Sequence, residues 1–194
     1  MKKINVQLSL ALLLIIGSLT TFSTLGGVVH EPVTTTVKSV SYSFIKDTIS
    51  KPYNPYYSNT STKKLRVSNE EWKRVLPADL YAVSRLADTE RPFTGKYWET
   101  DVKGTYYCAA CGFELFRSGA KFSSQCGWPS FFEQANSKSI VFRNDHSYGM
   151  QRIEALCGRC DGHLGHLFDD GPEPTGKRYC MNSIALDFIP DSKK

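Results

Sequence analysis

The stretch MQRIEALCGRC, residues 150–160, runs from an alternating apolar pattern directly into two cysteines spaced C-x-x-C. Alternation with a period of two predicts a β-strand. A second pair, CAAC at residues 108–111, follows the aromatic run TYY. Each pair places two thiols in one tight turn, and two such turns supply four thiolates for tetrahedral zinc. We therefore predict one structural Zn²⁺ per chain, which joins two segments of one sheet through Cys108, Cys111, Cys157 and Cys160.

Two other uses of these thiols stay open at this point. The chain has six cysteines, and in an exported chain that number first suggests three disulfides. A C-x-x-C pair can also form a short disulfide or a redox dithiol. A thioredoxin-like dithiol needs a βαβ setting, which this pattern of strands does not offer.

The rest of the folded part reads as mainly antiparallel β behind two short helices. Ser68 and Glu71 form a capping box before a helix over residues 69–75, and Pro77 opens a second short helix. After Arg91, runs such as SIVF and YCMNSIALDF alternate with glycine-containing turns. We predict one domain over residues 66–194.

The N-terminal part differs from this domain in pattern and in charge. Residues 1–30 join Lys2 and Lys3 to a long uncharged apolar run, which predicts a signal peptide or a membrane anchor through residues 4–29. Residues 31–65 read as a flexible linker. Residues 1–65 carry seven Lys/Arg and two Asp/Glu, whereas residues 66–194 carry seventeen of each. The folded part is therefore neutral, which argues against nucleic acid as a partner.

Removing the four predicted zinc ligands leaves Cys126 and Cys180. They could form a structural disulfide, either could be a buried thiol that packs like an apolar residue, or one could be a nucleophile and the other its resolving partner. The surroundings favour the last reading. Cys126 lies in the loop SSQCGWP, and Cys180 lies in an alternating run in which positions 180, 182, 184, 186 and 188 share one face. Arg178 lies on that face too and could favour the thiolate.

A histidine turn, GHLGHLFDDGP at residues 162–172, completes the candidate site. His163 and His166 suit proton transfer, and with the acids that follow them they could instead bind a second metal. Trp128 could line a pocket or simply pack in the core.

Together these stretches resemble the methionine-R-sulfoxide reductase family, the B type. The motifs that carry the resemblance are RPFTGKY (91–97), the two C-x-x-C pairs, KFSSQCGWPSFF (121–132), YGMQRIEALC (148–157), GHLGHLFDDGPEPTGKRYCMNS (162–183) and ALDFIP (185–190). The match covers roughly residues 66–190. Gln125 departs from the glycine expected before Cys126, which concerns the mobility of that loop.

The resemblance implies two antiparallel sheets in a tent-like arrangement. It implies that Cys180 is the nucleophile, that Cys126 resolves its sulfenic acid as a disulfide, and that His163 or His166 handles the proton. Trp128, Phe168, Arg178 and Asn182 match the substrate pocket, and the four paired cysteines match the structural zinc site. The implied substrate is methionine-R-sulfoxide in oxidised proteins, which are thereby repaired, and the implied reductant is thioredoxin or a thioredoxin-like dithiol.

Two rival classes remain at the level of sequence: a non-catalytic zinc-ribbon binding module and a secreted domain with three disulfides. We expect an exported monomer, which is periplasmic, extracellular or anchored to face outside the cytoplasm. The reductant, the preferred protein substrates, cleavage of the N-terminal segment and the identity of the proton donor are not set by the sequence.

Overall fold

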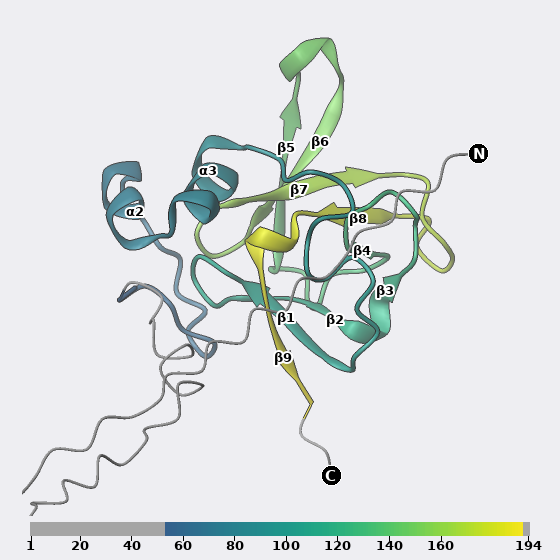
Figure 1. Cartoon of the computed structure of the whole chain (residues 1–194), viewed down its shortest axis with the longest axis horizontal. Helices are drawn as coiled ribbons and strands as arrows, with labels where there is room; N and C mark the ends of the chain where they lie inside the picture. The colour runs from purple at the N-terminus through teal and green to yellow at the C-terminus, as the bar shows by residue number, and fades with distance from the viewer. Residues whose placement is uncertain (1–52, 192–194) are drawn as a thin grey trace, which may run out of the picture. The chain divides into compact units, whose positions relative to one another are not determined.

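A computed structural model describes residues 53–191 (Figure 1). Two short helices come first, α2 (Asn69–Val75) and α3 (Ala78–Leu86). Ser68 caps α2 as predicted, because its side chain accepts a hydrogen bond from the Glu71 amide at 3.2 Å. Pro77 is the N-cap of α3, in which Leu80 and Val83 are buried.

The remaining regular structure is antiparallel β, in two sheets, as predicted (Figure 1). The three-stranded sheet has the order β2 (Glu114–Arg117), β1 (Gly104–Cys108) and β9 (Leu186–Pro190). The six-stranded sheet has the order β3 (Lys121–Phe122), β4 (Ser130–Phe131), β8 (Arg178–Met181), β7 (His163–Phe168), β6 (Arg152–Cys157) and β5 (Ile140–Asp145). Within the described residues there are three 3₁₀ turns, η1 (Ser118–Ala120), η2 (Ser147–Gly149) and η3 (Ser183–Ala185).

An aromatic core joins the two sheets. Phe116 of β2 stacks on Phe131 of β4 with ring centroids 4.2 Å apart, and Tyr179 of β8 packs edge-on against Phe116. Tyr106 of β1 and Phe131 are both fully buried and meet at 5.0 Å. Side chains alternate along a strand, so Tyr179 in this core directs its neighbour Cys180 to the opposite face of the sheet.

The prediction of one strand over residues 179–188 is wrong. Strand β8 ends at Met181, η3 intervenes, and β9 belongs to the other sheet. The break has a physical cause, since the buried Glu90 carboxylate accepts hydrogen bonds from the Ser183 and Ile184 amides at 2.5 and 3.1 Å. Those amides are thereby withdrawn from any strand ladder. The alternating face proposed for positions 180–188 does not exist.

Residues 53–65 contain no helix or strand, yet they contact the domain at many points. The Arg159 guanidinium, 5% exposed, donates to the carbonyls of Tyr56, Ser58, Lys63 and Cys111. The Ser58 amide in turn donates to the Cys111 carbonyl at 2.9 Å. We call residues 53–65 the strap. Contacts with the domain therefore begin before the expected boundary at Arg66.

The predicted signal or anchor segment and most of the predicted linker lie outside the described residues. Between residues 53 and 191, no helix has the length and apolar character needed to cross a bilayer.

Candidate active site and metal centre

A row of polar side chains crosses the six-stranded sheet from β4 to β5. Successive strand registers place Ser130 opposite Cys180, Cys180 opposite His166, His166 opposite Glu154, and Glu154 opposite Arg143. Directly opposed residues of antiparallel strands project to the same face. We call these five residues the cross-strand row. It lies on the face away from the aromatic core, so chemistry and packing use opposite sides of one sheet.

The expectation that His163 and His166 lie on a turn is wrong, because both belong to strand β7. A β-bulge brings His163 to the same face. His163 and His166 are three positions apart, which in a regular strand would put them on opposite faces. The register shifts by one residue between Ala155 and Leu156, so Leu164 is extra in β7. The two imidazole rings consequently meet with centroids 5.5 Å apart. Asn182 stabilises the bulge, because its backbone and side-chain amides donate to the Leu164 carbonyl at 2.8 and 3.0 Å.

Gly165 allows β7 to approach the cysteine strand closely. A Cβ added at this position would lie 2.0 Å from the Cys180 carbonyl oxygen. Real side chains never tolerate that distance, so any other residue would push β7 away from β8. The opposition of His166 and Cys180 depends on this glycine.

Cys126 and Cys180 lie together, with their Sγ atoms 3.5 Å apart and both thiols free. Beside them is a cavity of about 120 Å³. Five of the side chains predicted for the site line it: Trp128, His166, Phe168, Cys180 and Asn182. An aromatic wall therefore faces a thiol across a small apolar space.

The two thiols compete for one negative charge. Burial acts to raise the pKa of Cys126, but hydrogen bonds with the hydroxyls of Ser124 and Ser130 outweigh it and lower this pKa to about 7. For Cys180, burial is the largest cause that raises the pKa to about 12, and the neighbouring Cys126 adds to the shift. Arg178 favours the Cys180 thiolate, as expected, but is outweighed. The first charge of the pair therefore resides on Cys126.

Each histidine is held by a carboxylate. His166 Nε2 lies 2.7 Å from Asp145, which also accepts from Arg152 at 2.7 Å. His163 Nδ1 lies 2.7 Å from the buried Glu154, whose other oxygen accepts from Arg143. Ionised carboxylates only accept, so the bound nitrogen of each ring carries the proton. Burial lowers the pKa of His163 despite Glu154, so this ring is neutral at pH 7.

Glu90 binds two residues that line the cavity, Trp128 and Asn182, through its backbone. Its amide donates to the Asn182 side-chain oxygen at 3.0 Å, and its carbonyl accepts from the Trp128 indole N–H at 3.1 Å. With the Leu164 contacts, these bonds use both ends of the Asn182 amide, so Asn182 organises the pocket.

The last two predicted pocket residues form a pair at the edge of the site. Arg178 lies opposite Phe168 in register, with its guanidinium 4.2 Å from the ring centroid, and it binds Asp170 through two hydrogen bonds. His163 and Arg178 are absent from the lining of the small cavity, whereas His163 lines a second cavity beside it.

Sequence reasoning missed Glu90, Asp145, Arg152 and Glu154. A signal existed for Glu154, which is a lone acid within the apolar run RIEAL of a buried strand. Buried acids are almost always paired, so a partner for Glu154 could have been predicted from its position. Glu90 lies in an irregular loop with no such pattern.

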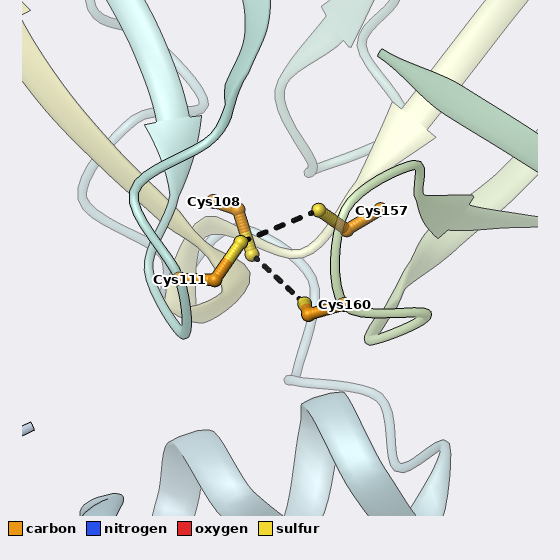
Figure 2. Close-up of side chains that lie close together, drawn as sticks. All are labelled: Cys108, Cys111, Cys157 and Cys160. Atoms are coloured by element: carbon orange, nitrogen blue, oxygen red, sulfur yellow. Dashed lines mark hydrogen bonds between the residues drawn. The ribbon is translucent and has the colours of Figure 1, made fainter. Parts of the chain in front are cut away.

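The four paired cysteines converge on one buried point (Figure 2). Their sulfurs all lie within 4.8 Å of one another, with Cys108–Cys160 at 3.8 Å and Cys111–Cys157 at 3.6 Å. Tetrahedral sites with metal–sulfur bonds of about 2.3 Å require sulfur separations of roughly 3.8 Å, whereas a disulfide needs about 2.05 Å. The donor set thus fits a tetrahedral metal. Among residues 53–191, no other cluster of three or more His, Cys, Asp or Glu side chains is placed to hold one, so His163 and His166 are not part of a second metal cluster there.

One expectation about this cluster is wrong. Cys108 ends β1 of the three-stranded sheet and Cys157 ends β6 of the six-stranded sheet, so the cluster joins two sheets rather than two segments of one.

Comparisons with known proteins agree with this geometry. The SelR domain family model matches residues 76–190, a range that holds all six cysteines. A protein of Methanosarcina barkeri named peptide methionine sulfoxide reductase MsrB is 53% identical over 126 residues, 65% of this chain and 89% of its own length. Proteins of the same name from Pseudomonas savastanoi and Acinetobacter baylyi are 52% and 49% identical, over 66% and 67% of this chain and 97% and 94% of their own lengths.

Proposed function

The chain belongs to the MsrB family of peptide methionine sulfoxide reductases, and from that premise we propose that it reduces the R epimer of methionine sulfoxide in oxidised proteins. Methionine sulfoxide is a polar, chiral lesion on an apolar side chain. Trp128 and Phe168 offer an apolar wall for its methyl group, and the polar side of the cavity receives its oxygen. The two epimers exchange these positions, so one pocket suits one epimer.

The observation that carries the proposal is the Cys180 thiol, 3.5 Å from Cys126 and opposite His166. Attack needs a thiolate at Cys180, and transfer of its proton to the Cys126 thiolate supplies one. The Cys180 sulfur then attacks the sulfoxide sulfur while the oxygen takes up a proton. The methionine S–O bond breaks as the hydroxyl passes to the Cys180 sulfur, and the electron pair of the transient S–S bond stays on the methionine sulfur, which leaves methionine and a Cys180 sulfenic acid.

His166 is the proton donor that this geometry favours. It lines the cavity with Cys180, and Asp145 holds its Nε2–H, so the doubly protonated ring would donate its second proton, on Nδ1, to the substrate oxygen. His163 lines the neighbouring cavity and is kept neutral by burial, which suits a positioning role.

Cys126 resolves the intermediate. Its sulfur displaces the hydroxyl of the sulfenic acid, which forms the Cys126–Cys180 disulfide and releases water. A thioredoxin-like dithiol then reduces this disulfide by exchange and is itself oxidised. The short separation of the two sulfurs supports this step, because disulfide formation needs little movement of the Cys126 loop or of strand β8.

We assign the four-cysteine cluster to structural zinc. Thiolate-only tetrahedral sites are typical of Zn²⁺, and four protein ligands leave no open position for catalysis. Bound zinc would hold the ends of β1 and β6 together, and the reaction would proceed through the separate thiol pair.

We further propose that the chain is exported. The Lys-led apolar segment at residues 1–30 supports this location, where the chain would repair secreted or surface proteins. Protease treatment of intact cells tests the proposal. A chain found only in the cytosol would overturn it.

Activity with separated epimers tests the main proposal. The full chain should reduce a peptide methionine-R-sulfoxide with dithiothreitol and leave the S epimer unchanged. Cys180→Ser should abolish turnover, and Cys126→Ser should retain it with dithiothreitol but lose it with thioredoxin. A zinc-loaded wild type that is inactive on both epimers would refute the assignment.

A further inference from the structure

Cys126 and Cys180 form one pair but face different spaces. Cys180 lines the catalytic cavity, whereas the residues that line this cavity do not include Cys126. Cys126 lies in the loop of residues 123–129, between the edge strand β3 and its neighbour β4, and its side chain is partly exposed. A small solute can therefore reach the Cys126 sulfur without entering the cavity that the sulfoxide side chain would fill.

The loop holds Cys126 in a fixed and costly conformation. The residues on either side of it, Gln125 and Gly127, both have left-handed backbones, with φ of 55° and 89°. The Gly127 carbonyl accepts a hydrogen bond from the Phe93 amide at 2.8 Å, which ties the loop to the segment before β1. Backbone strain of this kind gathers at functional sites. The position of the Cys126 sulfur is thus imposed by the fold.

Two hydroxyl groups surround the Cys126 sulfur. Ser124 Oγ lies 2.9 Å from it and Ser130 Oγ lies 3.6 Å from it, while the two hydroxyls lie 2.7 Å from each other. A thiolate can only accept, so a hydroxyl that bonds to it donates. These hydrogen bonds lower the pKa of Cys126 to about 7. A partly exposed sulfur that is held as a thiolate is the form of cysteine that oxidants attack.

We propose that the protein is also a thiol peroxidase, in which Cys126 reduces hydrogen peroxide and Cys180 is the resolving residue. The two cysteines then exchange the roles that they have in the reduction of methionine sulfoxide. This activity goes beyond the proposed function, because it has a different substrate and a different attacking sulfur. It draws on the same dithiol reductant.

The chemistry of the peroxidase cycle needs no further group. The Cys126 thiolate attacks one peroxide oxygen, the O–O bond breaks, and the departing hydroxide takes a proton from solvent and leaves as water. Cys126 is thereby oxidised to a sulfenic acid. The Cys180 sulfur, 3.5 Å away, displaces the hydroxyl of this acid, and the hydroxyl leaves with the Cys180 proton as a second water. Exchange with an external dithiol restores both thiols and oxidises that dithiol.

Trapping with dimedone identifies the residue that peroxide oxidises first. In full-length Cys180→Ser, equimolar hydrogen peroxide should produce a dimedone adduct on Cys126. In full-length Cys126→Ser, an adduct on Cys180 should form about tenfold more slowly with peroxide. The same variant should form that adduct readily with a peptide methionine-R-sulfoxide. Mass spectrometry locates the adducts. Absence of an adduct on Cys126, or equal rates in the two variants, would overturn the inference.

Peroxide consumption by the full-length wild type, with thioredoxin as reductant, gives a second test. Ser124→Ala should lower its rate constant for peroxide about tenfold at pH 7, the scale for loss of one hydrogen bond to a charged group. Ser123→Ala is the matched control, because Ser123 is the exposed neighbouring serine of the same loop, and it should leave the rate unchanged. Equal rates in the two variants would contradict the activation of Cys126 by Ser124.

The pH dependence of the wild-type rate tells which sulfur attacks. A reaction led by Cys126 should accelerate from pH 6 to pH 8 and then level off, because the pKa of Cys126 is about 7. A rate that keeps rising toward pH 10 would assign the attack to Cys180 and overturn the inference, since the pKa of Cys180 is about 12.

The two activities can fail independently. A wild type that reduces the R epimer of methionine sulfoxide, but consumes peroxide no faster than Cys126→Ser does, would overturn the peroxidase inference alone. A wild type that consumes peroxide through Cys126, but reduces neither epimer, would refute the proposed function and support the peroxidase.

Discussion

At the scale of single residues, the two cysteines of the candidate site, Cys126 and Cys180, have opposite environments at a separation of 3.5 Å. Cys126 receives hydroxyl hydrogen bonds from a loop, whereas Cys180 is buried in a strand beside it. The residue proposed to attack substrate is thus the one that holds its proton more firmly. In the resting protein, the resolving residue Cys126 should be the more reactive thiol.

Alkylation measures this order directly. With iodoacetamide at pH 7.5, Cys126 should be modified several times faster than Cys180, because its pKa is about 7 and that of Cys180 about 12. In Cys126→Ser the neighbouring negative charge is gone, so the pKa of Cys180 should fall. Alkylation of Cys180 should therefore become fast at a lower pH than in the wild type. Mass spectrometry of timed samples gives both rates. Faster modification of Cys180 in the wild type would contradict the assignment.

The backbone of Gln125 has an unfavourable conformation, and its side chain gives no reason for it. Its φ is 55°, a left-handed value that costs a non-glycine residue about 1 kcal/mol. This conformation is the physical reason for the glycine expected at that position. Gln125→Gly should raise the free energy of unfolding by a few tenths of a kcal/mol, because relief of strain is partly offset by unfolded-state entropy. Gln125→Val should lower it by about 1 kcal/mol, since β-branched residues fit this region poorly. Urea denaturation compares them, and a Val variant as stable as the wild type would contradict the strain.

At the scale of elements, the strap forms hydrogen bonds with both cysteine turns of the candidate metal centre. Arg159 lies inside the second cysteine pair, and four of its acceptors are carbonyls of the strap or of Cys111. Tyr56 adds a packing contact with the α2 residue Trp72, at 5.2 Å between ring centroids. The strap therefore links the two cysteine turns to the helices, although the family match begins only at residue 76.

Two shortened chains test this role. The free energy of unfolding of a chain that begins at Arg66 should be roughly 2–4 kcal/mol lower than that of a chain that begins at Tyr53. The shorter chain loses several hydrogen bonds to a buried cation and one aromatic contact. It should also release zinc to a chelator faster. The exposed Lys64–Asp161 ion pair supplies a control, since Lys64→Ala in the longer chain should cost less than about 1 kcal/mol. Equal stability of the two chains would show that the strap is dispensable.

Local patterns predicted the elements whose causes are local. Ser68 as a cap, the two helices, the cysteine turns and the strands β1, β5 and β6 follow from neighbouring residues. The break after Met181 does not, because Glu90 causes it from 93 positions away along the chain. The bulge at Leu164 is likewise set by a partner in another strand, Asn182.

The candidate site shows the same division. Residue type, spacing and the family resemblance singled out Cys126, Cys180, His163 and His166, and the structure places these side chains near one another. The carboxylates that hold the histidines lie on β5 and β6, and only strand pairing brings them there. Pairing is a property of the whole sheet, so one stretch of sequence cannot reveal it. That is why the pairing of Glu154 with His163 and of Asp145 with His166 was missed.

At the scale of the whole molecule, buried titrating groups make stability depend on pH. Burial lowers the pKa of His163 below 6.5, against the opposing effect of Glu154 and Asp145 and with a small contribution from His166. As the pH falls below about 6.5, His163 therefore binds a proton in the unfolded chain but stays neutral in the folded chain. Stability from this group is complete above that pH and is lost below it.

Urea midpoints measured with saturating zinc at pH 7.5, 6.5 and 5.5 should therefore fall toward acid. His163→Gln should flatten this dependence, because the titrating group is gone. Further loss below pH 4 should follow from Asp145, whose pKa is held well below its usual range by Ser147, His166 and Arg152. A midpoint that stays constant or rises from pH 7.5 to 5.5 would contradict the argument.

The cross-strand row has a consequence for how this protein can fail. Ser130, Cys180 and His166 meet only because three strands share one alignment, and neighbouring positions on each strand face the aromatic core. A slip of β8 by a single residue would bury the sulfur and turn Tyr179 or Met181 outward. Misaligned molecules would be inert rather than impaired, so activity per milligram counts the correctly assembled fraction of a preparation.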